Sequence, residues 1–124
     1  MLLNRDAYEV KPDNLIISSK HPTDIKIIKV KANQGVLERG TVFSLIDNNY
    51  VVYGSASNSI ENANCILSDR IDTTSDGEEE VAVSVYISGH FNSNELSLYP
   101  GTSLDLKSKE TLRMLGIYLS SSID

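Results

Sequence analysis

Apolar and polar residues alternate most regularly between residues 81 and 88. One face of this segment carries Val81, Val83, Val85 and Ile87, and the other carries Ala82, Ser84, Tyr86 and Ser88. A period of two is typical of a β-strand with two different faces. The pattern then predicts a turn over residues 89–92, a second alternating strand from Glu95 to Leu98, and a stop at Pro100-Gly101.

The segment from Leu104 to Leu115 has a helical pattern, in which charged residues that can face water separate the leucines. Asp105 or Ser108 is expected to cap the N-terminus of this helix. Gly116 suits the left-handed conformation that ends many helices. The chain should therefore leave the helix sharply and continue as Ile117-Tyr118-Leu119.

The middle of the chain is rich in Val, Ile, Phe and Tyr, which favour strands. Extended segments are predicted at residues 25–30, 36–38, 41–46 and 50–53. In the first of these, apolar residues occupy both phases, so we expect either a bulge or a strand buried on both faces. Asp47-Asn48-Asn49 should close a hairpin between the last two. The expected fold class is α+β, mainly β: a compact β-rich domain over residues 25–124 with a short C-terminal helix.

Residues 1–24 differ from the rest of the chain, because polar residues and two prolines surround one apolar patch, Leu15-Ile16-Ile17. Pro12 and Pro22 remove backbone donors and hold the preceding residues extended. One interpretation is an N-terminal arm, extended or flexible, that is anchored on a neighbouring surface through the patch. The alternative is that the patch forms an ordinary edge strand of the domain.

Composition narrows the possible functions. A net charge of −6 and a pI near 4.8 argue against binding to a phosphate backbone. We expect neither a membrane span nor a secretion signal, because the apolar runs are short and no basic stretch precedes one at the N-terminus. Synthesis in the host cytoplasm is the corresponding expectation. The single cysteine, Cys65, lies in an apolar segment and is predicted to be a buried structural thiol rather than a nucleophile.

The side chains that could support chemistry do not form a known motif. Asp72, Thr74, Asp76 and Gly77 follow part of an EF-hand spacing, but Val83 stands where the bidentate glutamate is needed, so an acidic solvated loop is the better interpretation. His21 and His90 are too few and too far apart in sequence for a zinc site. Lys26, Lys29 and Lys31 fit either edge protection or contact with an acidic surface. We expect no enzyme activity, catalytic residue, metal or cofactor.

The order of elements near the C-terminus is similar to that of phage head decoration proteins of the lambda type. The resemblance is carried by SGHFN (88–92), ELSLYP (95–100) and RMLGIYL (113–119), with ANCILSD (63–69) and LERGTV (37–42) upstream. It covers about residues 35–119. It implies a structural virion protein that binds the outer surface of the expanded phage capsid as a homotrimer at three-fold sites and stabilises it.

The resemblance also implies which partners to expect. These are other copies of the chain and the major capsid protein, with no nucleic acid or membrane. The arm residues assigned to capsid binding are Asp13, Asn14, Leu15, Ile16 and Ile17. Two alternatives stay open: another virion component, such as a head fibre base or tail protein, and a small metal-binding module that uses residues 72–80.

Overall fold

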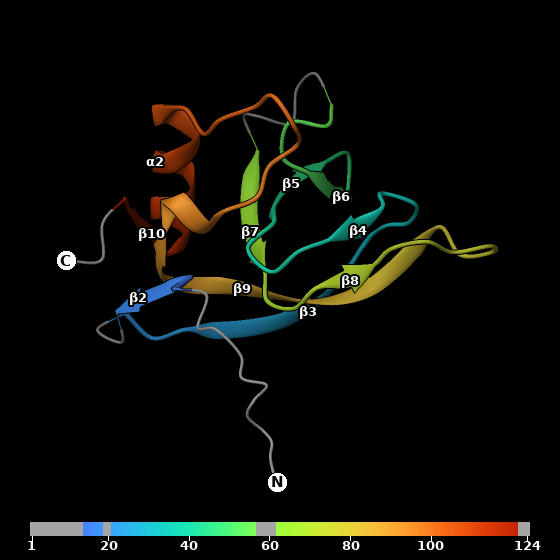
Figure 1. The fold of residues 1–124 in the computed structure, drawn as a ribbon, viewed down its shortest axis with the longest axis horizontal. Helices are drawn as coiled ribbons and strands as arrows, with labels where there is room; N and C mark the ends of the chain where they lie inside the picture. Colours follow the sequence, from blue (N-terminus) through green and yellow to red (C-terminus); the bar gives the residue numbers. More distant parts are fainter. Residues whose placement is uncertain (1–13, 19–20, 57–61, 122–124) are drawn as a thin grey trace, which may run out of the picture.

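A computed structural model describes residues 14–18, 21–56 and 62–121 (Figure 1). Strands account for most of the regular structure, which confirms the mainly β class. The strands are β2 (Ile16–Ser18), β3 (Asp24–Lys31), β4 (Val36–Leu37), β5 (Val42–Ile46), β6 (Asn49–Val52), β7 (Ala63–Leu67), β8 (Ile71–Asp72), β9 (Glu80–Asn92) and β10 (Ile117–Ser120). The helices are the 3₁₀ turn η2 (Ser93–Glu95) and the α-helix α2 (Leu106–Leu115).

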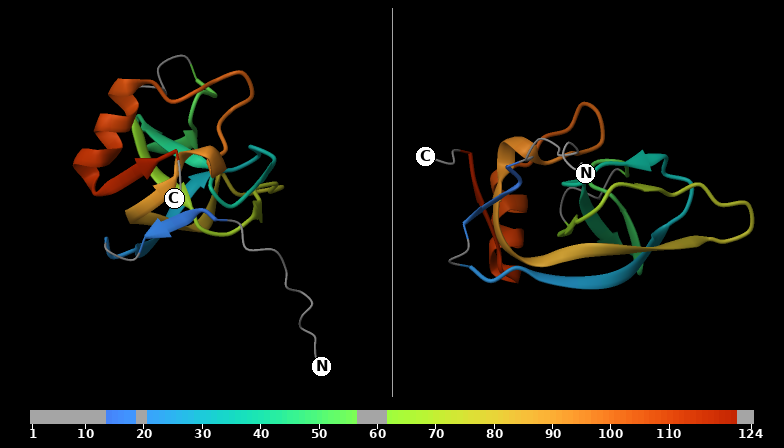
Figure 2. Two further views of the ribbon diagram at one scale, coloured as in Figure 1. Left: turned by 60° about the vertical axis from the view of Figure 1, so that its left-hand side comes forward. Right: turned by 60° about the horizontal axis from the view of Figure 1, so that its bottom comes forward.

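A small barrel is built around the long strand β9. In hydrogen-bonded order it runs β9, β3, β6, β5 and β7, and β7 pairs with β9 again. Beyond the barrel, the C-terminal part of β9 pairs with β2 and with β10. β4 and β8 form a separate two-stranded sheet. The barrel and α2 lie side by side, as the two further views show (Figure 2).

The β5–β6 hairpin confirms the predicted turn. Ile46 pairs with Asn49, so the loop consists of Asp47 and Asn48. Both loop residues have positive φ, 50° and 68°. Two successive residues with positive φ form the tight turn whose twist matches that of the flanking strands, and Asp and Asn tolerate this conformation better than most residues.

Alternate residues of the strands pack in two different hydrophobic cores. Cys65 and Leu67 of β7 pack with Val83 and Val85 of β9 in one cluster. Ile66, between those two β7 residues, belongs to a second cluster together with residues of α2 and β10. β7 is thus buried on both faces, which explains its nearly continuous apolar sequence ANCIL.

α2 begins and ends where local signals place it. The carboxylate of Asp105 accepts a hydrogen bond from the Ser108 N–H at 2.8 Å, and this bond lowers the pKa of Asp105. Gly116 ends the helix with φ of 100°. The Ser108 side chain is buried and lies 2.8 Å from the Tyr53 hydroxyl, which ties α2 to the barrel. The predicted helix from residue 104 starts two residues too early.

Two local predictions next to β9 are wrong. Residues 89–92 are not a turn, since β9 continues through them and Phe91 pairs with both Ile16 and Leu119. Residues 95–98 are not a regular strand. η2 ends at Glu95, and Ser97 makes an isolated bridge to Thr41. Partners distant in sequence decide both conformations, so the local pattern could not identify them.

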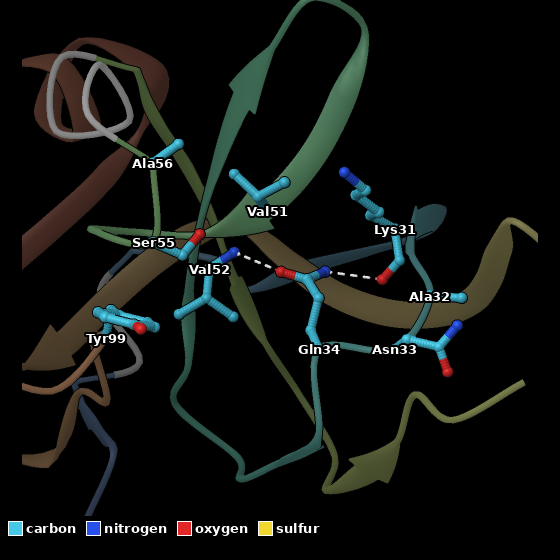
Figure 3. Close-up of a pocket in the computed structure, with 9 residues that line it drawn as sticks. All are labelled: Lys31, Ala32, Asn33, Gln34, Val51, Val52, Ser55, Ala56 and Tyr99. Atoms are coloured by element: carbon cyan, nitrogen blue, oxygen red, sulfur yellow. Dashed lines mark hydrogen bonds between the residues drawn. The ribbon is translucent and has the colours of Figure 1, made fainter.

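The side chain of Gln34 substitutes for backbone pairing between β3 and β6, which pair only at Val30 and Tyr50. Its Nε2 donates to the carbonyls of Lys31 and Tyr50 at 2.7 and 3.3 Å. Its Oε1 accepts from the N–H of Val52 at 2.9 Å (Figure 3). One side-chain amide therefore makes three hydrogen bonds to backbone groups where β3 and β6 pair at a single position.

Replacing Gln34 by methionine, which has a similar length, is expected to lower the free energy of unfolding by about 1–3 kcal/mol, because the Val52 N–H loses its acceptor. Urea denaturation measures this change. Gln34→Glu is the matched control. Its carboxylate can still accept from Val52, but its second oxygen would face the carbonyl oxygens of Lys31 and Tyr50, so this variant should also be less stable than wild type. A methionine variant as stable as wild type would contradict the bridging role.

Candidate functional site

The predicted arm residues have different environments. Asp13 lies outside the described residues, and Asn14 is exposed with φ of 55°. The side chain of Leu15 is 1% exposed and belongs to the core cluster that contains Phe91 and Leu112. Its carbonyl accepts a hydrogen bond from the Asn92 N–H at 2.8 Å. Leu15 therefore fixes the start of the described chain to the domain.

The next residues form β2, which pairs antiparallel with the C-terminal part of β9. Of the two alternatives for the Leu15-Ile16-Ile17 patch, the structure contains the edge strand, which is β2. Ile16 is nevertheless 39% exposed, so part of the patch faces outward. A capsid-binding role for Asp13 to Ile17 stays a prediction.

β3 places two large apolar side chains on the surface. Ile25 and Ile27 are 57% and 65% exposed, while Ile28 and Val30 are buried. The pairing with β9 shifts between Asp24 and Ile25, in agreement with the predicted bulge. Burial on both faces, the other alternative, is wrong. The sequence could not identify this exposed pair, because its apolar pattern is the same as that of a buried strand.

The exposed isoleucines share one side of β3 with two of its three lysines, and we name this surface the β3 face: Ile25, Ile27, Lys29 and Lys31. β2 and β3 pair with successive parts of β9 and lie next to each other along it (Figure 1). Exposed apolar residues grouped in this way often mark an interaction site.

The two histidines are distant in sequence but close in space. The ring centroids of His21 and His90 lie 5.6 Å apart, and His21 also packs on Tyr118 at 4.4 Å. His90 is in β9 rather than in a turn, and its Nε2 lies 2.7 Å from the Ser120 Oγ. These contacts link β10 to the segment before β3. Within the described residues, no three His, Cys, Asp or Glu side chains group in a way that could hold a metal ion.

The acidic segment and the cysteine have structural environments. Asp72 belongs to β8, and its Oδ1 accepts a hydrogen bond from the Thr74 N–H at 3.0 Å, which lowers the pKa of the Asp72 carboxyl. This bond closes a local turn. Cys65 is buried as predicted, and desolvation raises the pKa of its thiol to about 12. A thiol with this pKa stays protonated near neutral pH and is a poor nucleophile.

The described part of the chain contains no helix with the length and apolar character that a bilayer span requires. Comparison with known proteins gives a more specific result. The sequence model of the family described as bacteriophage lambda head decoration protein D matches residues 7–117. The chain belongs to this family. A search of curated proteins gave no match.

The match to the head decoration protein D family confirms the resemblance and extends it toward the N-terminus. It reaches residue 7 and so includes Asp13 to Ile17, whereas the sequence motifs began near residue 35. Members are structural virion proteins and are not known as enzymes. The protein therefore has a structural role as a decoration protein of a phage capsid.

The head decoration protein also has a hollowed surface that the sequence motifs did not indicate. Two adjoining hollows of about 340 and 260 Å³ share Gln34, Val52 and Tyr99. Figure 3 shows the first of them. We name them together the Tyr99 groove. Its lining comes from residues 31–41, 51–56 and 97–100, so only the folded chain brings it together.

Proposed function

We propose that the protein binds the outer surface of the expanded phage capsid as a homotrimer at three-fold sites and stabilises the shell. The observation that carries this proposal is the family match over residues 7–117, which spans both the N-terminal segment and the β-rich domain. The role of the protein is mechanical, because it joins neighbouring copies of the major capsid protein. The protein is made in the host cytoplasm and is then added to the virion surface.

The N-terminal segment and the β3 face are the proposed capsid contacts. Leu15 anchors the base of the segment in the core, so residues before it start from a fixed point. The exposed side chains of Ile16, Ile25 and Ile27 supply apolar area that gains free energy when it leaves water. Lys29 and Lys31 are exposed on the same side of β3 as these isoleucines and suit an acidic capsid surface.

Trimer formation would strengthen a weak individual contact. Once one subunit is bound, its two neighbours are held at a high local concentration, and their contacts cost little additional entropy. A trimer bound to several capsid proteins then opposes their separation under internal pressure. Decorated shells should accordingly withstand higher temperature than undecorated shells of the same phage.

Co-sedimentation with expanded capsids that lack the decoration protein tests the proposal. The full chain should bind saturably, with about three copies at each three-fold site. Removal of residues 1–13 should weaken binding at least about tenfold through lost multivalent contact. This deletion is preferable to removal of residues 1–24, because the longer deletion also removes Leu15 from the core and β2 from the sheet.

Ile27→Lys is the second variant, with Leu45→Lys as its control. Both changes replace an exposed apolar side chain by lysine, but Leu45 lies on β5, outside the β3 face. We expect weaker capsid binding from Ile27→Lys alone. If the full chain does not bind capsids, the proposal is wrong and a head fibre or tail location becomes the better hypothesis. A rise in melting temperature with calcium would favour the metal-binding module.

A further inference from the structure

A cyclic trimer makes a specific demand on the surface of its subunit. Each copy must present two different patches, because the contact around a three-fold axis is head to tail and each patch meets the other type on the next copy. The two patches must complement each other in shape and charge. This inference rests on the proposed trimer. Two surfaces of the described chain have the different shapes and charges that such a contact requires.

The first patch is the outer face of α2. Leu106 and Met114 are 75% and 81% exposed, and they lie eight residues apart, about two helical turns. Ser108 and Leu112 occupy the opposite, buried face. Two apolar side chains so exposed on one helix face are typical of a helix that packs in a groove of a partner.

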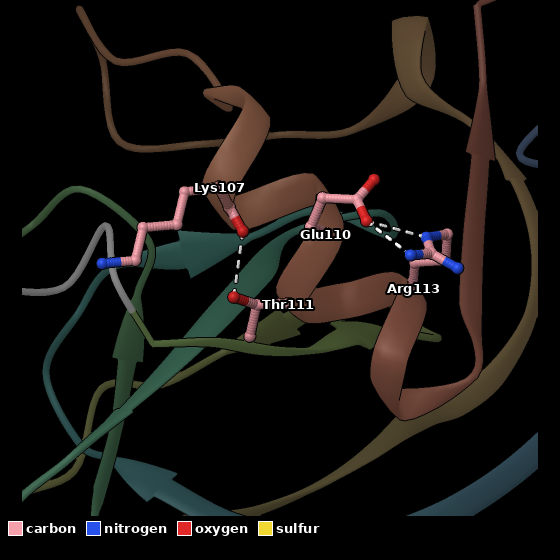
Figure 4. A network of polar contacts seen from close by, with 4 residues as sticks. All are labelled: Lys107, Glu110, Thr111 and Arg113. Atoms are coloured by element: carbon pink, nitrogen blue, oxygen red, sulfur yellow. Dashed lines mark hydrogen bonds and ion pairs between the residues drawn. The ribbon is translucent and has the colours of Figure 1, made fainter.

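Charged residues surround these apolar side chains. Lys107, Lys109 and Arg113 are exposed on α2. Arg113 forms an ion pair with Glu110 at 2.6 Å, and Glu110 lies between Leu106 and Met114 in the sequence (Figure 4). Three basic residues against Glu110 and the N-cap carboxylate of Asp105 leave the α2 face with a small positive charge.

The second patch is the Tyr99 groove. Its apolar lining includes Val36, Val52, Leu98 and Tyr99. Val36 and Tyr99 are 47% and 49% exposed, so this lining is open to a partner. The groove therefore offers a concave apolar surface, whereas the α2 face is convex.

Charged residues border the groove. Glu38 lines one of its two hollows and forms an ion pair with Arg70 at 3.1 Å, and Lys31 lines the other hollow. Glu78, Glu79 and Glu80 line a further hollow that shares Lys31, Ala32 and Asn33 with the other. The four glutamates outnumber Lys31 and Arg70, so the rim is negative and opposite in charge to the α2 face, as two surfaces that meet each other should be.

The positions of the two patches suit a ring. α2 lies at one end of the molecule, and β4, whose Val36 and Leu37 line the groove, lies toward the other end (Figure 1). In one molecule the α2 face and the β4 side of the groove are therefore far apart. We infer that the α2 face of each subunit packs in the Tyr99 groove of the next subunit, and that this contact closes the trimer.

Disulfide cross-linking between introduced cysteines tests this contact. Met114→Cys labels the helix face, and Tyr99→Cys labels the groove. A mixture of the two single variants should give a covalent dimer under oxidising conditions, and the double variant should give a covalent trimer. Each single variant alone should give neither. The native chain is the control, since Cys65 is buried and should not cross-link.

A dimer from Met114→Cys alone would overturn the inference, because it would show that two α2 faces meet each other. The absence of cross-links from a protein that sediments as a trimer would also overturn it. The same reactions on capsid-bound protein separate the two proposals. If the protein binds at three-fold sites without the Met114–Tyr99 cross-link, only this inference fails; if it does not bind, the proposed function fails.

Charge reversal gives a second readout that does not depend on cysteine geometry. Met114→Glu should weaken trimer association at least about tenfold, because it places a negative charge against the acidic rim. Met114→Leu keeps the apolar contact and should associate normally. Met114 is largely exposed, so both variants should fold with the stability of the native chain.

Discussion

Replacing Phe91 by alanine is expected to lower the free energy of unfolding by about 3–5 kcal/mol, among the largest effects of any single substitution in this protein. The ring is fully buried and lies 5.2 Å from that of Tyr86. The backbone of Phe91 also pairs with Ile16 on one side and with Leu119 on the other. One residue thus connects the strands that come before and after the barrel.

Urea denaturation of Phe91→Ala and Phe91→Leu measures this effect. Leucine restores much of the lost volume, so it should cost less than alanine. Hydrogen exchange should show the largest loss of protection in β2, β10 and α2, which meet at the cluster around Phe91. A loss below about 1 kcal/mol for the alanine variant would mean that this cluster adds little to stability.

Phe91 also shows where sequence patterns fail. Its neighbours Gly89 and Asn92 are residue types that are frequent in turns, so the local sequence predicts a turn. The segment is extended because β2 and β10 supply partners that lie far away in the sequence. Pairing with two distant strands outweighs the local preference, and a single sequence does not contain that information.

Local signals, by contrast, predicted the features that depend on local geometry. Asp47 and Asn48 form the hairpin turn, Asp105 caps α2, and Gly116 ends it. Each of these conformations depends on backbone groups only a few residues away. The C-terminal motifs also sufficed to indicate the family, because their order follows the path of the chain.

The candidate surfaces were harder to predict than the fold. Leu15 and Ile16 are adjacent apolar residues, yet one is in the core and the other is partly exposed. Ile25 and Ile27 have the pattern of buried residues and are exposed. An apolar residue that contacts another subunit follows the same rules as one in the core, so the sequence alone cannot separate them.

Gly40→Ala is the second substitution with a large expected effect, because two independent costs act at this position. Gly40 has φ of 99°, which costs an alanine about 1–2 kcal/mol. A Cβ atom there would also lie 2.6 Å from the Glu95 carbonyl oxygen. That oxygen belongs to the backbone, which cannot simply rotate away, and forced overpacking costs about 1–3 kcal/mol more. We therefore expect about 3 kcal/mol in total.

Gly35→Ala is the matched control for Gly40→Ala. Gly35 has φ of 89°, but an added Cβ would meet no atom within 4 Å, so only the conformational cost remains. Comparison of the two variants by urea denaturation isolates the steric cost, and equal losses would show that the Glu95 segment moves aside freely. Gly40 donates its N–H to the Leu67 carbonyl and accepts from the Ser97 N–H, so it joins the barrel to the segment that leads to Tyr99. Gly40→Ala should for this reason also disturb the groove and weaken trimer association.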